Sequence, residues 1–479
     1  MKIGHPRLSH SLREHLCRRI QVKVLKWRIK RACKIFLQFR NRVKRIRSIE
    51  GKGAALSASS NTIVQTPRVV DWRVRGTGPA HARKPLLAIL ADHPVQHFSP
   101  LYKELARNES IGSVVIFANL KGAEPYFDED LKEQLSWGNG ILDAFPYVSL
   151  ATSGSVSLHS IWKGLGTVLA DVRPDVLFVY GYSVPISRAG ILWGRFHGTP
   201  MVMTCDSELL HPRSLLTRAA KAVIIPHVLR QFDRLFTVGD ANENYFLRYG
   251  ASRTKFVRVS FPIDSQLLGE VRIRRAEIRR EVRTALNVSN SAFLLLTAGK
   301  LTPRKGHSDL VIAFQKAIER RSEKETYLLI AGSGSERDRL EQLAAETNSR
   351  VRFLGFVPPT ELFRLYAASD LYVHPSNIDP HPLAISEAIY CGLPIVASDR
   401  IGSIGPTDDV IPGVNGWSYP CGDVTALANL LAEIMKKPMQ LEKAGKSSLE
   451  NAARHHPRAI ASIIANTVVS LVDNRRAFQ

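Results

Sequence analysis

The sequence YVHPSNIDPHPLAISEAIYCGLPIVAS, residues 372–398, reads as an apolar strand, a loop, a helix and a second apolar strand. Asp379 lies in the loop and Glu387 in the helix, so two carboxylates flank the apolar start of that helix. Such a junction presents backbone N–H groups and a positive helix end, which suit a phosphate. The N–H groups of Leu383 and Ala384 would cap the phosphate, and a carboxylate beside them can accept hydrogen bonds from sugar hydroxyls.

The same strand and helix unit recurs on both sides of this stretch. Short apolar strands that alternate with helices favour parallel sheets covered on both faces. We therefore expect an α/β fold with two doubly wound, Rossmann-like halves, and ligands at the carboxyl ends of the strands and in the cleft between halves. The clearest strands are PLLAILADHP (85–94), DVLFVYGYS (175–183), TPMVMTCD (199–206), RLFTVGD (234–240), AFLLLTAGK (292–300) and TYLLIAGSG (326–334).

Changes in composition along the chain predict its organisation. Gly, Ala, Ser and Pro dominate the stretch before the first strand, which is typical of a linker. A polar, Arg-rich helical stretch separates the two series of strands and predicts the connection between domains. The expected parts are a basic amphipathic segment (1–50), a flexible linker (51–84), a first Rossmann-like domain (85–270), a second Rossmann-like domain (271–450) and a C-terminal helix that packs back on the first domain (451–479).

Length and composition limit the class of protein. A chain of 479 residues can hold two or three domains, and its 44% hydrophobic and 23% charged content is that of a soluble globular protein. The five cysteines form no CxxC pair, so neither a disulfide framework nor a zinc site is indicated and a cytoplasmic setting is favoured. No run of about 18 apolar residues occurs, so we expect no membrane-spanning helix.

The net charge of +23 is concentrated at the start of the chain. Residues 1–50 contain sixteen Lys and Arg against two Glu, with apolar side chains every three or four residues from Val22 to Ile46. This pattern is typical of a helix that lies on an anionic membrane surface, here through residues 20–47. A loosely folded basic arm that contacts nucleic acid or a protein, and an organelle transit peptide, remain open. The rest of the chain is only moderately basic, which gives no reason to expect a nucleic-acid-binding core.

Residues 285–430 resemble the donor domain of the family-four retaining glycosyltransferases, also described as glycosyl transferases group 1. These enzymes have the GT-B fold, two Rossmann-like domains that face each other across a cleft. The first half resembles the acceptor domain of the family more weakly. The motifs of the resemblance are GKLTPRKG (299–306), LLIAGSG (328–334), VRFLGFVPPTELFRLYAASDLYVHPS (351–376) and the acidic pair followed by EAIYCGLPIVASD (387–399).

The resemblance implies a site for a nucleotide diphosphate sugar, with no cofactor and no metal. Lys300 stands where the family usually has Arg, and Lys305 stands on its phosphate lysine. Two cations just past a strand end can also stabilise a diphosphate leaving group on chemical grounds alone. Glu387 would accept hydrogen bonds from the nucleotide ribose. Asp379 replaces a Glu that contacts the donor sugar, and its shorter side chain would need a closer loop or a bridging water.

Further donor-side candidates are weaker. Gly332 and Gly334 would let the backbone approach a ligand at a strand end, although a plain turn uses the same residues. Val357, with Phe356 before it, lies where the resemblance implies the base-binding loop. Both side chains are equally suited to a core or a turn.

Candidates on the acceptor side lie in the first half. Asp206 occupies the place near which the family often has a histidine, and it could orient the acceptor hydroxyl or the donor sugar, or simply cap a helix. His93, Gln96 and His97 follow the first strand, where their polar side chains could bind a sugar.

Asp128 and Asp130 spell the Asp-x-Asp that metal-dependent glycosyltransferases of another fold use for a divalent ion. Here no apolar strand precedes them, and the stretch DEDLKEQL is polar. We expect a solvated helix start there and no metal site.

These patterns predict a metal-independent retaining glycosyltransferase of the hexosyltransferase type. It would act in the cytoplasm or on the inner face of a membrane, on a glycan or lipid-linked acceptor, in polysaccharide, cell-envelope or glycolipid synthesis. One alternative is a sugar-nucleotide epimerase of the same fold, which needs no acceptor. Another is a catalytically decayed scaffold whose basic arm binds a membrane or nucleic acid.

Overall fold

The computed structural model describes residues 83–123, 126–128, 133–135, 139–151, 158–319, 325–345 and 350–477. The expected basic segment 1–50, and the expected linker as far as residue 82, lie outside these ranges. Both parallel sheets belong to one compact unit, which among the described residues includes 83–212 and 222–477. Residues 213–221 belong to a second unit.

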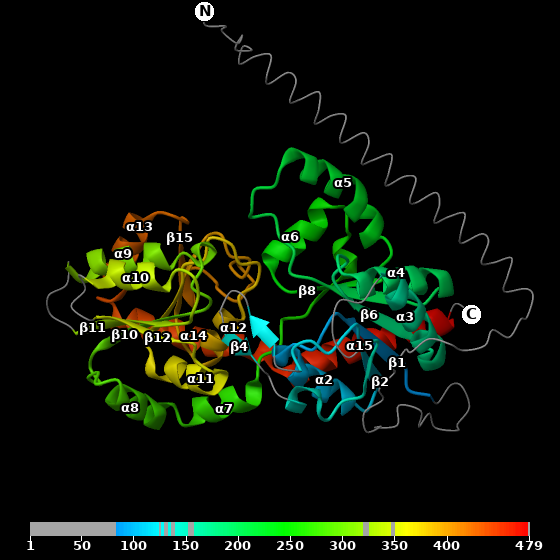
Figure 1. Ribbon diagram of the computed structural model, residues 1–479, viewed down its shortest axis with the longest axis horizontal. Coiled ribbons are helices and arrows are strands. Elements are labelled where there is room, and N and C mark those ends of the chain that lie inside the picture. Colours follow the sequence, from blue (N-terminus) through cyan, green and yellow to red (C-terminus); the bar gives the residue numbers. More distant parts are fainter. Residues whose placement is uncertain are drawn as a thin grey trace, which may run out of the picture. The chain divides into compact units, whose positions relative to one another are not determined.

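The first half of the described chain forms a parallel sheet of seven strands (Figure 1). Its order is β5-β2-β1-β6-β7-β8-β9. The first strand in sequence, β1, lies inside the sheet, where Leu86 pairs with Gly112 of β2 and Leu87 pairs with Val176 of β6. The strands are β1 (Leu86–Ala91), β2 (Gly112–Phe117), β5 (Tyr147–Ser149), β6 (Val176–Tyr180), β7 (Met201–Thr204), β8 (Arg234–Thr237) and β9 (Phe256–Arg258). The helices are α2 (Ser99–Ala106), α3 (Leu158–Val172), α4 (Pro185–His197), α5 (Leu215–Leu229) and α6 (Asp240–Arg248).

The second half forms a parallel sheet of six strands within the described residues. Its order is β12-β11-β10-β13-β14-β15, so consecutive strands wind outward in both directions from β10. The strands are β10 (Phe293–Ala298), β11 (Thr326–Ala331), β12 (Val351–Gly355), β13 (Leu371–His374), β14 (Ile395–Ser398) and β15 (Gly416–Tyr419). The helices are α7 (Ser265–Ile273), α8 (Arg275–Ala285), α9 (His307–Glu319), α10 (Arg337–Ala344), α11 (Pro359–Ala368), α12 (Leu383–Tyr390), α13 (Val424–Ile434) and α14 (Pro438–Ala452).

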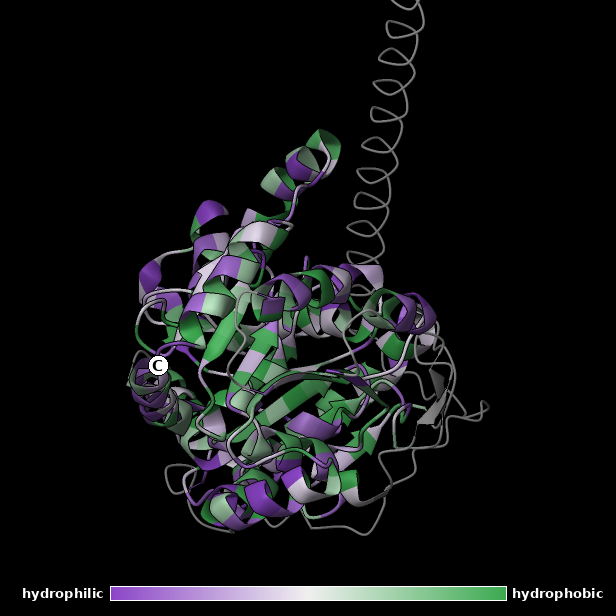
Figure 2. Ribbon diagram, turned by 90° about the vertical axis from the view of Figure 1, so that its left-hand side faces the viewer, coloured by the Kyte–Doolittle hydropathy of each residue, from purple (hydrophilic) through white to green (hydrophobic). Residues whose placement is uncertain are grey.

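Both sheets are covered on two faces, which explains their unbroken apolar strands. In β10 all six residues are buried; Leu294 and Leu296 join one core cluster and Leu295 joins another. Successive residues of a strand point to opposite faces, so apolar residues in sequence require helices on both sides. Figure 2 shows the hydrophobic strands inside and the hydrophilic residues on the outer faces of the helices.

The last helix, α15 (Pro457–Ala477), packs on the first sheet although it follows the second half in sequence. Its residues Ile460, Ile464 and Val468 share a core cluster with Leu87 and Ile89 of β1. The chain therefore crosses between the halves twice, once after β9 and once before α15. In the described part of the chain, no helix is both long and apolar enough to cross a membrane.

One expectation about local structure was wrong. The stretch around Asp128 is not a helix start, because β3 (Tyr126–Asp128) pairs antiparallel with β4 (Glu133–Leu135). Aromatic residues favour extended backbone, and Tyr126 and Phe127 precede the acidic residues. Asp130 lies outside the described residues.

Candidate functional site

A glycine places Lys305 at the carboxyl edge of the second sheet. The single turn Pro303–Lys305 follows β10 and ends at Gly306, whose φ is +67°. A Cβ at Gly306 would lie 2.2 Å from the carbonyl oxygen of Pro375, in the loop after β13. Only glycine permits both the left-handed conformation and this approach. The loops after two adjacent strands, β10 and β13, are thereby brought into contact.

That contact joins two of the predicted residues. The ammonium of Lys305 pairs with Oδ2 of Asp379, and the side chains are 19% and 13% exposed. Nε2 of His374 lies 3.0 Å from the same carboxylate oxygen. Burial alone would raise the pKa of Asp379, but the hydrogen bond with His374 and the charge of Lys305 outweigh it and hold the pKa well below its usual range. Asp379 is therefore a carboxylate at neutral pH.

His374 is a site residue that sequence reasoning missed. It is the last residue of β13, and its Nδ1 lies 3.4 Å from the hydroxyl of Tyr372, which donates to the carbonyl oxygen of Ala298. Burial lowers the pKa of His374, and the hydrogen bond with Asp379 opposes the shift. Its position at the end of a parallel strand was the signal that could have found it, because ligands bind at that edge.

Glu387 lies on α12 and is half-buried. The hydroxyl of Tyr366 donates to its Oε2 over 3.0 Å. Burial raises the pKa of Glu387 to about 7, and the nearby charge of Asp264 adds to the rise. Leu383 and Ala384 are the first two residues of α12, and the N–H groups of such residues have no partner within their own helix. The two N–H groups are thus at an open helix start, and their contact with a phosphate stays a prediction.

A recess lies in front of the first turn of α9, close to Lys305. Thr302, Gly306, His307, Arg339 and Asn377 are among its lining residues. Asp309 and Glu336 also line the recess, and Arg339 pairs with Glu336 over 3.1 Å. The recess therefore contains both acidic and basic side chains, and its lining gives no preference for an anion.

The glycines after β11 have a structural role that the sequence left open. A Cβ at Gly332 would lie 1.9 Å from the carbonyl oxygen of Gly299, and one at Gly334 would lie 2.5 Å from that of Leu301. Their bare backbones thus let the loop after β11 approach the loop after β10, which carries Lys300. Lys300 itself is half-buried.

Val357 follows β12 and packs against a core cluster of the second half. The neighbouring side chain of Phe356 is 39% exposed. Phe356 thus has the exposure of a turn residue, whereas Val357 packs as a core residue. A role of either side chain in binding a base stays a prediction.

On the first sheet, Asp206 follows β7 and keeps an exposed surface. Desolvation by the surrounding protein raises the pKa of Asp206, and the charges of Asp379 and Glu208 raise it further. The loop that follows Asp206 contacts the second half directly, since the guanidinium of Arg400 donates to the carbonyl oxygen of Leu210 over 2.6 Å.

The three candidates after β1 have different surroundings. Nδ1 of His93 lies 3.3 Å from Oδ2 of Asp92, and both side chains are about 40% exposed. Burial lowers the pKa of His97 to about 4, and its ring contacts that of Phe98, with centroids 4.3 Å apart. Gln96 is half-buried in the same single turn. His97 is therefore neutral at physiological pH. Within the described ranges, no hydrogen bond or ion pair joins these three side chains to Asp379, whose side-chain partners are Lys305 and His374.

The arrangement combines three chemical capacities in one place. Lys305 and the first turns of α9 and α12 can hold a diphosphate. Asp379 and Glu387 can accept hydrogen bonds from hydroxyl groups. Asp206 is a further carboxyl group, which comes from the first half. This set suits a phosphorylated, polyhydroxylated ligand better than an apolar one.

Models of two protein families match the chain. Residues 278–451 match the model described as glycosyl transferases group 1, and residues 95–262 match that of a glycosyl transferase 4-like domain. The two matches do not overlap, and between them they contain both parallel sheets except for β1.

Curated relatives match parts of the chain. An uncharacterized glycosyltransferase of Methanocaldococcus jannaschii is 39% identical over 142 residues, 29% of this chain and 35% of its own. A GDP-mannose-dependent monoacylated alpha-(1-6)-phosphatidylinositol monomannoside mannosyltransferase of Corynebacterium glutamicum is 27% identical over 227 residues, 45% of this chain and 57% of its own. The matched parts thus span from about a third to somewhat over half of these relatives.

Solved structures share the whole fold. The Anabaena protein HepE, in complex with UDP and glucose, has a TM-score of 0.58 at 19% identity, with 81% of this chain and 100% of that chain covered. A UDP-GlcNAc 2-epimerase from Neisseria meningitidis, bound to UDP-GlcNAc, has a TM-score of 0.55 at 14% identity, with 81% and 100% covered. The fold is GT-B, and it is common to a sugar-nucleotide epimerase as well.

Proposed function

The chain belongs to the glycosyl transferases group 1 family, and we propose that it transfers a sugar from a nucleotide diphosphate sugar to an acceptor hydroxyl. The observation that carries the proposal is the pairing of Lys305 with Asp379 beside the first turns of α9 and α12. A cation and two helix starts provide for the diphosphate, while carboxylates provide for hydroxyl groups.

The proposed reaction breaks the bond between the anomeric carbon and the diphosphate oxygen. The acceptor oxygen forms the new bond on the face that the leaving group departs, so the configuration is retained. The acceptor proton passes to the departing phosphate oxygen, which balances the step without a separate base. Lys305 and Lys300 stabilise the negative charge that develops on the diphosphate, so no metal ion is needed.

The carboxylates hold the donor in this scheme. Glu387, oriented by the hydroxyl of Tyr366, accepts hydrogen bonds from the ribose. Asp379 contacts the sugar, and His374 fixes the direction in which its carboxylate points. Asp206 reaches the sugar or the acceptor from the first half, and His93, Gln96 and His97 are the proposed acceptor-side residues.

A donor screen followed by a variant tests the proposal. UDP-, GDP- and ADP-sugars are compared by thermal shift, because a ligand of the native state raises the melting temperature. With the donor found, Lys305→Ala should lower transfer by about 100-fold or more. The matched control is Lys436→Ala, which removes an exposed lysine of the same half. Full transfer by Lys305→Ala would contradict the assignment.

The epimerase alternative is tested with the same materials. An epimerase converts the nucleotide sugar without an acceptor, whereas a transferase leaves the donor sugar unchanged until an acceptor is added. Product analysis of donor incubated alone therefore distinguishes the two. Absence of donor binding in the whole protein would instead favour a decayed scaffold.

We also propose that the protein works at an anionic membrane surface, in cell-envelope polysaccharide or glycolipid synthesis. The arm of residues 20–47 lies outside the described residues, so the support comes from α5. Leu215, Val223 and Ile224 of this helix are 79%, 67% and 56% exposed. From residue 212 to residue 232 the sequence contains basic but no acidic residues. An exposed apolar helix with only positive charge is suited to the headgroup region of an anionic bilayer.

Vesicle flotation tests this second proposal. The protein should float with vesicles of phosphatidylglycerol and phosphatidylcholine, and Val223→Asp with Ile224→Asp should reduce the floating fraction. Met439→Asp is the control, since Met439 is 84% exposed on α14. Equal flotation of all three proteins would remove α5 from the proposal.

A further inference from the structure

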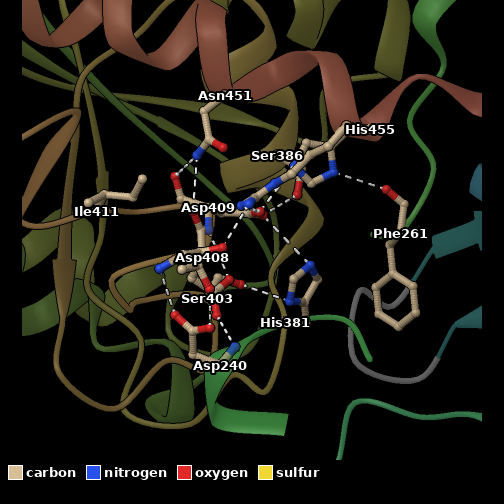
Figure 3. Close-up of polar contacts among 12 residues, drawn as sticks. Asp240, Phe261, His381, Ser386, Ser403, Asp408, Asp409, Ile411, Asn451 and His455 are labelled. Atoms are coloured by element: carbon tan, nitrogen blue, oxygen red, sulfur yellow. Dashed lines mark hydrogen bonds and ion pairs between the residues drawn. The ribbon is translucent and has the colours of Figure 1, made fainter. Parts of the chain in front are cut away.

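Two adjacent carboxylates, Asp408 and Asp409, are completely buried in the loop between β14 and β15 (Figure 3). Taking a carboxylate out of water is costly unless partners compensate it. The loop between two strands does not require acidic residues inside. The residues that Asp408 and Asp409 contact therefore indicate the role of this loop.

Asp409 joins two parts of the chain that are remote in sequence. Its Oδ1 lies 3.0 Å from Nε2 of His455 and 2.5 Å from a terminal nitrogen of Arg454. Its Oδ2 accepts a hydrogen bond of 2.7 Å from the hydroxyl of Ser386. One carboxylate thus connects α12 with the segment that leads into α15.

His455 in turn joins the two crossings between the halves. Its Nδ1 lies 3.1 Å from the carbonyl oxygen of Phe261, and its own carbonyl oxygen accepts from the N–H of Ile263. The first crossing follows β9 and the second precedes α15, so one side chain fastens them together (Figure 3). Both ring nitrogens face oxygen acceptors, and both can donate only when the ring carries two protons.

Asp408 contacts the first half directly. Its Oδ2 accepts from the N–H of Asp240, the first residue of α6, over 2.5 Å. Asp240 in return accepts from the N–H of Thr407 over 2.9 Å. Glycines allow this mutual fit, because a Cβ at Gly239 would meet Asp408 and one at Gly405 would meet Asp240, each within 2.4 Å.

The two carboxylates that are proposed to bind the sugar donor, Asp379 and Glu387, lie next to these contacts in sequence. Ser386 immediately precedes Glu387 on α12, and His381 follows Asp379 by two residues. Nδ1 of His381 lies 3.0 Å from the hydroxyl of Ser403, and its ring meets that of Phe261 edge-on, with centroids 5.0 Å apart. Both donor carboxylates are therefore attached to the crossings through short chains of contacts.

We propose that Asp409 is a positioning residue that links α12 to the two crossings, so that binding of a nucleotide at α12 sets the position of the first half. The link runs from Glu387 through Ser386 to Asp409, then through His455 to Phe261. Asp408 and Asp240 complete it on the side of the first half. This inference rests on the proposed sugar transfer, because it concerns how the donor and the acceptor side are brought into register.

The proposal is distinct from a role in holding the loop together. If Asp409 only held the loop together, breaking its contacts would lower the stability equally with and without nucleotide. If Asp409 couples the two halves, breaking its contacts would change the effect that nucleotide binding has on distant residues.

Ser386→Ala breaks the link at its least disruptive point. It removes one hydroxyl and leaves the buried charge of Asp409 paired with Arg454 and His455. The matched control is Ser448→Ala, another buried serine, whose hydroxyl bonds the carbonyl oxygen of Leu393 over 2.7 Å within the second half. Both variants lose one buried hydrogen bond from a serine hydroxyl, so their effects on stability should be similar.

Hydrogen exchange of the full chain with UDP and with GDP measures the coupling without turnover. In the wild type, the nucleotide that binds should protect amides of α12, of both crossings and of the start of α6. In Ser386→Ala, protection of α12 should remain while that of the crossings and α6 falls by about tenfold. The Ser448→Ala variant should behave as the wild type. Protection of the crossings that persists in Ser386→Ala overturns the proposal.

Kinetics give a second readout once the donor is known. Ser386→Ala should lower kcat by about tenfold and leave the nucleotide Kd within about twofold, because the link acts between the halves. Asp240→Asn should lower kcat in the same way, and the double variant should lose less than the product of the single effects. Unchanged kcat, or a change confined to Kd, overturns the coupling. If the wild type binds none of UDP, GDP and ADP, the proposed function fails as well, whereas an active wild type with unaffected variants refutes this inference alone.

Discussion

Lys305 and Asp379, one after β10 and the other after β13, form an ion pair at the carboxyl edge of the second sheet. The ammonium that is proposed to hold the diphosphate is thus already paired with the carboxylate proposed to hold the sugar. A donor must share this lysine with Asp379 or displace it. If both proposed roles hold, the shorter acid that replaces the family's Glu should influence phosphate binding as well as sugar recognition.

Asp379→Asn should separate these two roles. Without the carboxylate, Lys305 is free for the phosphates, so UDP or GDP should bind about three- to tenfold more tightly. Transfer should fall, because the neutral amide oxygen of Asn accepts hydrogen bonds from the sugar more weakly than a carboxylate does. Calorimetry of nucleotide binding and a transfer assay measure the two effects. Asp399→Asn, which changes a half-exposed aspartate of the same half, is the control, and weaker nucleotide binding in Asp379→Asn would show that the ion pair orients Lys305 productively.

Glu387 should make nucleotide binding depend on pH. Burial raises its pKa to about 7, so the carboxylate that is proposed to accept from the ribose is lost to protonation below that pH. The affinity for UDP or GDP should decline by up to about tenfold for each pH unit below 7. Glu387→Gln cannot ionise and should show a flatter profile, which also corrects for protonation of the nucleotide. Identical profiles of the two proteins would place Glu387 away from the ribose.

The same group should make stability depend on pH with a defined sign. The pKa of Glu387 is raised from 4.5 to about 7, so the folded protein binds a proton that the unfolded chain releases. The stabilisation is complete below pH 4.5 and is lost as the pH rises through 7. Glu387→Gln should therefore be more stable than the wild type at pH 8, by about 1–3 kcal/mol.

Urea unfolding at pH 5 and pH 8 measures this difference. At pH 5 the two proteins should have similar free energies of unfolding, because Glu387 is then neutral when folded. The exposed Glu450 provides the control, and Glu450→Gln should be indistinguishable from the wild type at both values. A wild type that is the more stable protein at pH 8 would contradict the raised pKa.

Much of the second half could be predicted from the sequence because its strands are unbroken apolar runs. AFLLLTAGK, TYLLIAGSG and LPIVAS each end at a Gly or a polar residue, and β10, β11 and β14 lie within them. The hairpin of β3 and β4 could not be predicted, since three-residue strands are too short for a periodic pattern. The acidic residues between them then favoured a helix.

The candidate site, too, could be predicted from the sequence only in part. Lys305 and Asp379 were found through motifs, and the structure places them in contact, while their roles stay predictions. His374 was missed because LYVHPS reads as core, and its contact with Asp379 depends on how the loop folds back. The pair Asp408 and Asp409 has no local pattern that predicts burial, because their partners His455 and Asp240 come from distant parts of the chain.

Gly306→Ala tests whether the contact between the β10 and β13 loops positions Lys305. The added Cβ would lie 2.2 Å from the carbonyl oxygen of Pro375, so the turn must move away and carry Lys305 with it. Gly422→Ala is the matched control, because Gly422 also has a positive φ, +82°, but its Cβ would meet no atom within 4 Å. The left-handed conformation alone costs about 1–2 kcal/mol in each variant. Gly306→Ala should lose more stability than the control and most of its nucleotide affinity, whereas equal stability and equal affinity in the two variants would mean that Lys305 is positioned by other contacts.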